Sequence, residues 1–363
     1  MSKAAELAAL IGSQTALSNR NLIINGAMQV AQRGTSSTAS GYGTVDRFKT
    51  EFAGVSVTQS QEALSSGSPY EDGHRFFLRA TNTSVSSATS AFLQMYQNVE
   101  AQNLATSGWN ATSSTSFVTY SFWVRSSLAG TYYINIRSLD GTLQNFSSPV
   151  VLVANTWKKV TLPIPGNSNI TIDNNNGAGL FIGIVPHYGT DYTTSGHTAD
   201  AWAAYSGTDI TPDYSQSWTN TASATFDITG IQLEAGEQAT PFEHRSYGDE
   251  LARCQRYFRK LVDGADTTTF MNFHAWSANE CIGALNLGGP MRANPTMSVS
   301  SAGHFVMRSG GTDRTATTFS FAQASKSGFV RVETGSGGGL TTGRGAWLKA
   351  DNASAYIYAD AEL

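Results

Sequence analysis

The side chains best suited to holding a ligand lie in one long stretch, from His187 to Trp218. It shows little regular alternation of polar and apolar residues, as expected of a loop. Long loops commonly carry function, and the flat, partly apolar face of an aromatic ring suits the face of a sugar ring. We predict six glycan-contacting residues here: Tyr188, Tyr192, Trp202, Tyr205, Tyr214 and Trp218. The alternative is that these rings cover the edge of a sandwich or pack between subunits.

Residues suited to acid–base or nucleophilic catalysis are dispersed along the chain. No G-x-S-x-G motif is present, and the carboxylates are scattered. The six histidines lack metal-ligand spacing: His74, His187, His197, His244, His274 and His304. We therefore expect a protein that is not an enzyme and carries no cofactor. A glycan-degrading depolymerase stays an alternative, because two carboxylates can meet only in space.

Two short segments superficially match ligand-binding loops. Gly335–Gly345 is rich in glycine but fits neither the phosphate-loop nor the dinucleotide-binding pattern, so we expect a turn. Asp173, Asn175 and Gly177 have the alternating spacing of a calcium loop, but the later glutamate is missing. A plain turn is the prediction there, with a structural calcium left open.

Composition limits the class of protein. The 363 residues predict two or three domains. Charged residues are 14% of the chain, the net charge is −4, and Lys and Arg are scattered, so we expect no nucleic-acid partner. No apolar run is long enough to predict a membrane span. Cys254 and Cys281 complete no zinc site and are expected to be ordinary thiols, as in a reducing cytoplasm.

Alternation with a period of two dominates after Arg20 and predicts an all-β fold. Phe117–Ser127 places every second residue on an apolar face, and so do the segments around Tyr132 and Leu180. Between Phe226 and Leu233 the alternation changes register at Gly230, which predicts a β-bulge. We expect a jelly-roll β-sandwich followed by a second, smaller β-sandwich domain.

A short charged stretch separates the two predicted domains. Pro241 ends the last strand of the first domain, and Asp249 is expected to cap a helix that follows. Apolar residues at helical spacing continue that helix to Leu261. The predicted organisation is an anchoring helix over 1–18, a jelly roll over 19–246, a linker helix over 247–262 and a C-terminal β domain over 263–363.

The N-terminal helix is predicted from good helix formers and one apolar stripe. Leu7, Leu10 and Leu17 recur at steps of three and seven residues. A helix this short is marginal alone. We expect it to bundle with its own copies or to dock on another protein; a frayed tail is the alternative.

Several motifs, in a fixed order, resemble a known family. They are "NLIINGAMQVAQRG" (21–34), "VDRF" (45–48), "VEAQNLA" (99–105), "SFWVRSS" (121–127), "NTWKKVTLPIPG" (155–166), "DNNNGAGLFIG" (173–183) and "ITGIQLEAGEQATPFEHRSYGDELARCQRYF" (228–258). Together they resemble bacteriophage tail-fibre and virion structural proteins that carry a jelly-roll domain like that of carbohydrate-binding modules. The resemblance covers about residues 20 to 260. The terminal "ADAEL" is also similar to the ends of such proteins.

The resemblance implies a non-enzymatic virion component that is assembled in the host bacterial cytoplasm. It implies a homotrimer, a tail fibre or fibre-like appendage, and a role in recognising and attaching to the host surface. The expected partners are its own copies, other virion proteins through the N-terminal helix, and a host-surface glycan or receptor. A head fibre or capsid decoration protein is the structural alternative. The resemblance carries over no catalytic residue, and its polar positions, such as Asn25, Asp46 and Arg245, are expected to be structural.

Overall fold

The computed structural model describes residues 20–264 and 269–363. The predicted anchoring helix over residues 1–18 lies outside these ranges. The chain divides into two compact units, the first ending at Glu250 and also taking in Leu363, the second running from Leu251 to Glu362. Both consist mainly of strands, which confirms the predicted all-β fold class. Among the described residues, no helix has the length and apolar character needed to cross a membrane.

The first unit is built from twelve described strands and a few short helical turns. The strands are β1 (Ser36–Ser37), β2 (Lys49–Ala53), β3 (Val57–Ala63), β4 (Phe76–Asn82), β5 (Phe92–Glu100), β6 (Phe117–Ser126), β7 (Gly130–Ser138), β8 (Gln144–Leu152), β9 (Lys158–Pro165), β10 (Ala178–Tyr188), β11 (Trp202–Ala204) and β12 (Thr225–Ala235). The helical turns are α2 (Ser68–Glu71), α3 (Ala101–Ala105) and η2 (Trp218–Asn220).

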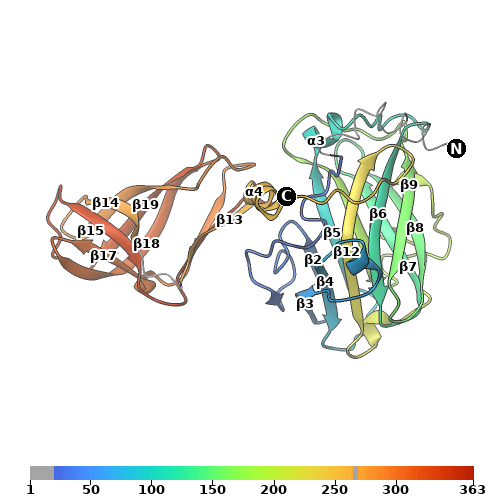
Figure 1. The fold of residues 1–363 in the computed structure, drawn as a ribbon, viewed down its shortest axis with the longest axis horizontal. Helices are drawn as coiled ribbons and strands as arrows, with labels where there is room; N and C mark the ends of the chain where they lie inside the picture. Colours follow the sequence, from blue (N-terminus) through green and yellow to red (C-terminus); the bar gives the residue numbers. More distant parts are fainter. Residues whose placement is uncertain (1–19, 265–268) are drawn as a thin grey trace. The chain divides into compact units, whose positions relative to one another are not determined.

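These strands form two six-stranded antiparallel sheets (Figure 1). The first sheet has the order β1-β3-β4-β12-β6-β9 and the second β11-β8-β7-β10-β5-β2. Apolar residues of both sheets form one buried core between them. The unit is therefore a jelly-roll β-sandwich, and the core holds the second sheet rigid as a platform for whatever lies on its outer face.

Sequence periodicity predicted which residues enter this core. On β6, Val118, Tyr120 and Phe122 alternate into it, as do Leu180 and Ile182 on β10. This agreement follows from the strand period of two, which sends successive side chains to opposite faces.

The predicted β-bulge at Gly230 is also present. The pairing of β12 with β6 shifts register between Thr229 and Gln232, and Gly230 has a φ of 63°. That left-handed conformation favours glycine. A Cβ at this position would also lie 2.6 Å from the ring of His74.

The linker helix is shorter than predicted, and this corrects the sequence reading. Helix α4 spans Tyr247–Gln255, and strand β13 (Phe258–Asp263) replaces the predicted last turns. The spacing of apolar residues fits a helix, but β13 pairs with β21 (Tyr356–Asp360), about 100 residues later, and that tertiary pairing decides the conformation.

The capping residue of α4 also differs from the prediction. The Oγ of Ser246 accepts a hydrogen bond from the backbone N of Asp249 at 3.2 Å and donates to its carboxylate at 2.6 Å. Ser246 therefore occupies the N-cap position, with Asp249 three residues further on.

The second unit contains a closed six-stranded barrel and a three-stranded sheet (Figure 1). The barrel has the order β14-β15-β19-β18-β17-β20 and the sheet β13-β21-β16. The remaining strands are β14 (Thr269–Ala275), β15 (Glu280–Asn286), β16 (Thr296–Val299), β17 (Phe305–Ser309), β18 (Thr312–Ser325), β19 (Phe329–Ser336) and β20 (Gly345–Ala350), with the turn η3 (Ala302–His304).

Closure of the barrel distinguishes this unit from the small sandwich expected from the sequence. Strand β14 pairs with both β15 and β20, so the sheet returns on itself and leaves no edge strand in the barrel. Alternating inward and outward residues are common to sandwiches and barrels, and the sequence pattern does not separate the two.

Polar residues in the family-like motifs are buried and hydrogen-bonded in the first unit. The amide of Asn25 donates to the carbonyls of Val30 and Asp46 at 2.8 and 3.0 Å and accepts from the Val30 N–H at 3.0 Å. Arg245 donates to the carbonyls of Ile23 and Asn21 at 3.1 and 2.6 Å. These contacts satisfy buried backbone groups, which is the structural role expected for such positions.

Candidate functional site

The candidate site of the first unit lies on the outer face of the second sheet. Residues that alternate with the core residues of β2, β5, β7 and β10 point away from the core and carry polar and aromatic groups. They are Lys49, Glu51, Gln94, Tyr96, Arg137 and Phe181. Part of this face is covered by the stretch between β10 and η2, the same stretch in which the sequence predicted ligand-contacting aromatics.

Arg137 is the central cation of this face. Its guanidinium carbon lies 3.8 Å from the ring centroid of Phe181 and 5.3 Å from that of Tyr205. The Phe181 ring also contacts Tyr96, with centroids 4.2 Å apart. The two aromatic rings hold the guanidinium flat on the sheet through cation–π contacts. No carboxylate forms an ion pair with Arg137 among the described residues, so its charge is available to a ligand.

A hydrogen-bonded chain runs beside Arg137. Tyr188 donates to Oε1 of Gln94 at 2.5 Å, and Nε2 of Gln94 donates to Glu51 at 2.7 Å. Glu51 also accepts from the hydroxyl of Tyr96 at 3.0 Å and pairs with Lys49 at 3.2 Å. Each member therefore fixes the orientation of the next, which is how a preorganised polar surface is built.

Electrostatics keep this chain in one protonation state near neutral pH. Burial alone raises the pKa of Glu51, but the Gln94 hydrogen bond and the Lys49 charge outweigh it, and the net shift lowers the pKa. Burial raises the pKa of Tyr188 and of Tyr96 far above the ordinary tyrosine value. Glu51 is thus an acceptor and both tyrosines are donors.

Four of the six predicted aromatics meet on this face. Val185, Tyr188 and Ile210 form a small buried cluster, against which Tyr192, Tyr205 and Tyr214 pack. Tyr188 is 4% exposed, so it supports the surface from below and has almost no free ring face. Tyr192, Tyr205 and Tyr214 are half-buried and are the members of this set that retain ring surface.

The two tryptophans lie elsewhere, and this corrects part of the sequence prediction. Trp218 is 0% exposed and belongs to the sandwich core, so no ligand can reach its ring. Trp202 packs against Phe146, with centroids 5.4 Å apart, and its indole N–H donates to the carbonyl of Pro165 at 2.7 Å. Sequence shows that a tryptophan is present in a loop, but only the tertiary fold decides whether the loop turns that ring inward.

Sequence reasoning missed Glu51, Gln94 and Arg137. They sit at outward positions of ordinary strands, where polar residues are the default because that face usually meets water. The available signal was that Tyr133, Asn135 and Arg137 alternate with the core residues of β7, so that an aromatic ring and a cation share the outward face. That signal recurs on many sheets, so it does not single out a site.

A Ser–His–Asp constellation connects the same stretch to strand β8. Oγ of Ser147 lies 2.7 Å from Nε2 of His197, whose Nδ1 lies 2.8 Å from Oδ1 of Asp209. This is the order of contacts found in a nucleophilic triad. Ser147, however, is 0% exposed, because the Asp200 N–H binds the Ser147 carbonyl at 2.7 Å and the loop covers the side chain. A nucleophile must be reachable by its substrate. The three side chains are therefore best described as a hydrogen-bonded link between the loop and β8.

The predicted turn over 173–177 is a local hydrogen-bonded loop. Oδ1 of Asn175 accepts from the Gly177 N–H at 2.7 Å, and its Nδ2 donates to Asp173 at 3.3 Å. Within the described ranges, no group of three or more His, Cys, Asp or Glu side chains is placed to hold a metal ion. Cys254 and Cys281 are both buried, and neither forms a disulfide within the described part of the chain.

Comparison with known proteins gives weak likenesses. No family model and no curated protein sequence matches the chain. Similar solved structures include the enzymatically active domain of tailspike protein 4 from bacteriophage CBA120, with 11% identity and a TM-score of 0.34 over 60% of this chain and 21% of that chain. Another is the family 11 carbohydrate-binding module of Clostridium thermocellum, in complex with a β-1,3-1,4-mixed-linked tetrasaccharide, with 12% identity and a TM-score of 0.29 over 56% of this chain and 98% of that chain.

A third similar structure is the N-terminal cellulose-binding domain of the Cellulomonas fimi β-1,4-glucanase C. It has 8% identity and a TM-score of 0.29, covering 58% of this chain and 99% of that domain. At these TM-scores the architecture of this chain rests on its own strand pairing, and the likenesses say nothing about what it binds.

Proposed function

We infer that this chain is a non-enzymatic, carbohydrate-binding component of a bacteriophage virion, a fibre-like appendage that attaches to a glycan of the host surface. The phage assignment is supported by the ordered motifs between residues 21 and 258. The carbohydrate assignment is supported by the outer face of the second sheet.

The observation that carries the proposal is the clamping of Arg137 between two aromatic rings beside the Gln94–Glu51 chain. Tyr192 and Tyr205 are partly buried and retain some accessible surface, and Arg137 and Glu51 offer a donor and an acceptor at fixed positions. A sugar offers the complement: an apolar C–H face for a ring and hydroxyl groups for the polar partners. The buried Tyr188, 4% exposed, supports this surface, so little ordering is needed when a ligand binds.

Binding to purified host envelope polysaccharide, measured by calorimetry, tests the proposal. Tyr205→Ala is expected to weaken binding about tenfold, since one ring–sugar contact is worth about 1.4 kcal/mol. Tyr70→Ala is the matched control: Tyr70 is 36% exposed and also lies against a guanidinium, that of Arg75 at 4.0 Å, but it is remote from the second sheet's outer face in sequence and contacts. Equal affinity of the two variants would place glycan binding elsewhere.

Assembly is the second part of the proposal. As the family resemblance implies, the chain forms a homotrimer and joins the particle through residues 1–18. Light scattering at micromolar protein concentration is expected to report three copies, and immunogold labelling of intact particles is expected to mark a tail appendage. A stable monomer contradicts the trimer, and label on the capsid favours a head fibre.

A further inference from the structure

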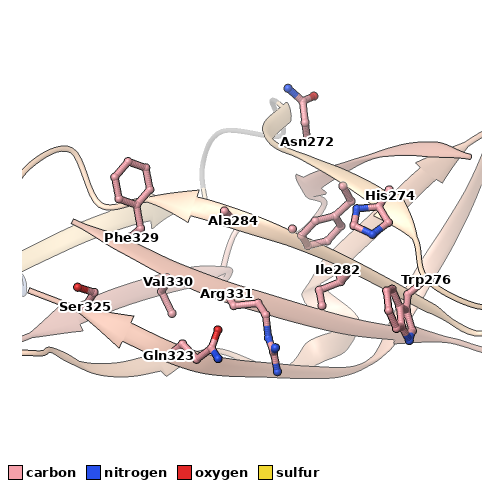
Figure 2. Close-up of a pocket in the computed structure, with 12 residues that line it drawn as sticks. Asn272, His274, Trp276, Ile282, Ala284, Gln323, Ser325, Phe329, Val330 and Arg331 are labelled. Carbon is pink, nitrogen blue, oxygen red and sulfur yellow. The ribbon is translucent and has the colours of Figure 1, made fainter. Parts of the chain in front are cut away.

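The second unit has a groove of its own on the outer surface of the barrel. It has a volume of about 690 Å³ and is lined by strands β14, β15, β18 and β19. Figure 2 shows Phe329 at one side and Trp276 with His274 at the other, with Ile282 and Arg331 between them. We call this feature the barrel groove. Its volume lies within the range of about 300–1,000 Å³ common to small-ligand sites.

The barrel groove is bordered by two aromatic rings that are largely in solvent. Trp276 is 65% exposed and Phe329 is 53% exposed, whereas the apolar side chains inside the barrel are almost all buried. Large aromatic side chains are normally buried, so two of them beside one hollow mark a surface that a ligand covers. The second unit has another exposed tryptophan, Trp347, at 54%, but it does not line the groove.

Polar side chains stand around the apolar floor. Asn272 and His274 project from β14, and Gln323 lies on β18. None of these three side chains makes a hydrogen bond within residues 20–264 and 269–363. Their amide and imidazole groups therefore have donors and acceptors to offer to a ligand.

Gln323 is held in an uncommon backbone conformation. Its φ is 54°, and the pairing of β18 with β19 shifts register between Ala322 and Ser325. A β-bulge changes the direction in which a side chain points, and a left-handed backbone conformation is unfavourable for a residue other than glycine. The bulge gives Gln323 a place in the lining of the groove that a regular strand would not provide.

Charge in the barrel groove is balanced. Arg331 pairs with Glu333 at 2.6 Å, two residues further along the same face of β19. The groove therefore presents flat apolar surface and hydrogen-bonding groups, and the charge of Arg331 is already paired with a carboxylate. This combination matches a neutral sugar, whose pyranose rings carry C–H faces for the indole and phenyl rings and hydroxyls for the amides and the imidazole.

We propose that the barrel groove binds a neutral hexopyranose oligosaccharide. Trp276 and Phe329 stack on two of its rings. The side chains of Asn272, His274 and Gln323 form hydrogen bonds with its hydroxyl groups. This site belongs to the second unit alone and does not rest on the sheet face of the first unit. A second copy of the chain seated on the groove is the competing occupant, and the experiment separates the two.

The test uses the full-length chain carrying Tyr205→Ala, which removes the ring contact proposed for the first unit. The probe is an array of neutral tetra- to hexasaccharides of glucose, galactose and mannose, with Kd values of the hits measured by calorimetry. Binding is expected to fall about tenfold or more with Trp276→Ala and with Gln323→Ala. Trp347→Ala, an equally exposed tryptophan of the same barrel outside the groove, is expected to leave Kd unchanged.

Three results would overturn the proposal. One is that no neutral oligosaccharide on the array binds the Tyr205→Ala protein. Another is that Trp276→Ala and Trp347→Ala retain the same affinity. The third is that Trp276→Ala lowers the oligomeric state in light scattering, which would assign the groove to a second copy. Since both tryptophans are exposed, unchanged circular dichroism is expected for each variant and shows that loss of binding is not loss of folding.

Discussion

The hydroxyl of Ser147 lies 2.7 Å from Nε2 of His197, yet Ser147 is entirely enclosed. Asp209 orients the other ring nitrogen at 2.8 Å and also accepts from Thr194 at 2.7 Å. The hydrogen bonds from Thr194 and His197 lower the pKa of Asp209, so it stays a carboxylate near neutral pH. These hydrogen bonds link the loop between β10 and η2 to strand β8.

The first prediction is that Ser147 is chemically silent. Incubation with a fluorophosphonate probe is expected to leave the mass of the intact protein unchanged, because the probe cannot reach a fully buried hydroxyl. Ser147→Ala is expected to destabilise the fold by about 1–3 kcal/mol, since it leaves the His197 nitrogen without a partner. A covalent adduct mapped to Ser147, or release of reducing ends from host glycan that Ser147→Ala abolishes, would contradict the non-enzymatic proposal.

The second prediction concerns Asp227, whose side chain is 1% exposed between two arginines. Arg79 Nε lies 2.7 Å from Oδ1, and Arg125 Nη2 lies 2.7 Å from Oδ2, each arginine directly opposite Asp227 on β4 or β6. Asp227→Asn keeps the shape but leaves two guanidinium groups without their carboxylate. We expect a loss of about 2–4 kcal/mol in the free energy of unfolding, measured in urea. Asp191→Asn, at an exposed loop carboxylate, is the control and is expected to change it by less than about 0.5 kcal/mol.

The third prediction is a loss of stability as the solution becomes acidic. Burial lowers the pKa of His187 to about 4, and burial together with the charge of His244 lowers that of His74 to about 4. Unfolded histidine titrates near 6.5, so below that pH the unfolded chain binds protons that the folded chain does not. Stability contributed by the neutral rings is present above pH 6.5 and is lost as pH falls through about 4.

Thermal unfolding followed between pH 7 and pH 4 measures this effect. His187→Gln is expected to flatten the slope in that window, and the exposed His274→Gln is expected to leave it unchanged. The contribution of His187 is of the order of 3 kcal/mol across the window, before relaxation of its surroundings reduces it. An equal slope in the two variants would show that His187 does not contribute to the acid response.

Much of the first unit could be predicted from sequence, because its strands obey a local rule. Val118 and Tyr120 enter the core and Thr119 between them does not, as alternation requires. The conformation of Phe258 could not be predicted in this way. Its spacing suits the helical face of α4, but its pairing with Asp360 lies about 100 residues away in the chain. The same limit applies to Trp218, whose burial depends on the whole sandwich closing around it.

The sequence predicts the aromatic residues of the candidate site but not its polar residues. Loop aromatics can be recognised by composition, and four of them do gather on one face. Gln94 and Arg137 come from different strands, β5 and β7, separated in the sheet by β10. Their meeting depends on strand order, which no local pattern encodes.

The last prediction concerns Gly189, where the aromatic-bearing loop leaves β10. Its N–H donates to the carbonyl of Ala91 at 2.8 Å, and a Cβ added there would lie 2.1 Å from the carbonyl oxygen of Thr89. That oxygen is a backbone atom and already accepts a hydrogen bond from the Asp191 N–H at 3.0 Å. Moving it would therefore break this hydrogen bond and distort the backbone. Gly189→Ala must therefore displace the start of the loop, and we expect a loss of about 1–3 kcal/mol in stability.

Displacement of the loop is expected to have a second consequence. Tyr188 precedes Gly189 and Tyr192 follows it by three residues, so both rings shift and the surface around Arg137 loses its support. In the Gly189→Ala variant, limited proteolysis is expected to cut between residues 189 and 217 faster than in the wild type. The affinity of this variant for host polysaccharide is expected to be lower as well. Gly196→Ala is the matched control within the same loop, since an added Cβ there meets nothing within 4 Å. If both variants are cut at the wild-type rate, contact with the backbone of Thr89 and Ala91 does not hold the loop, and aromatic packing must stabilise the outer face of the second sheet.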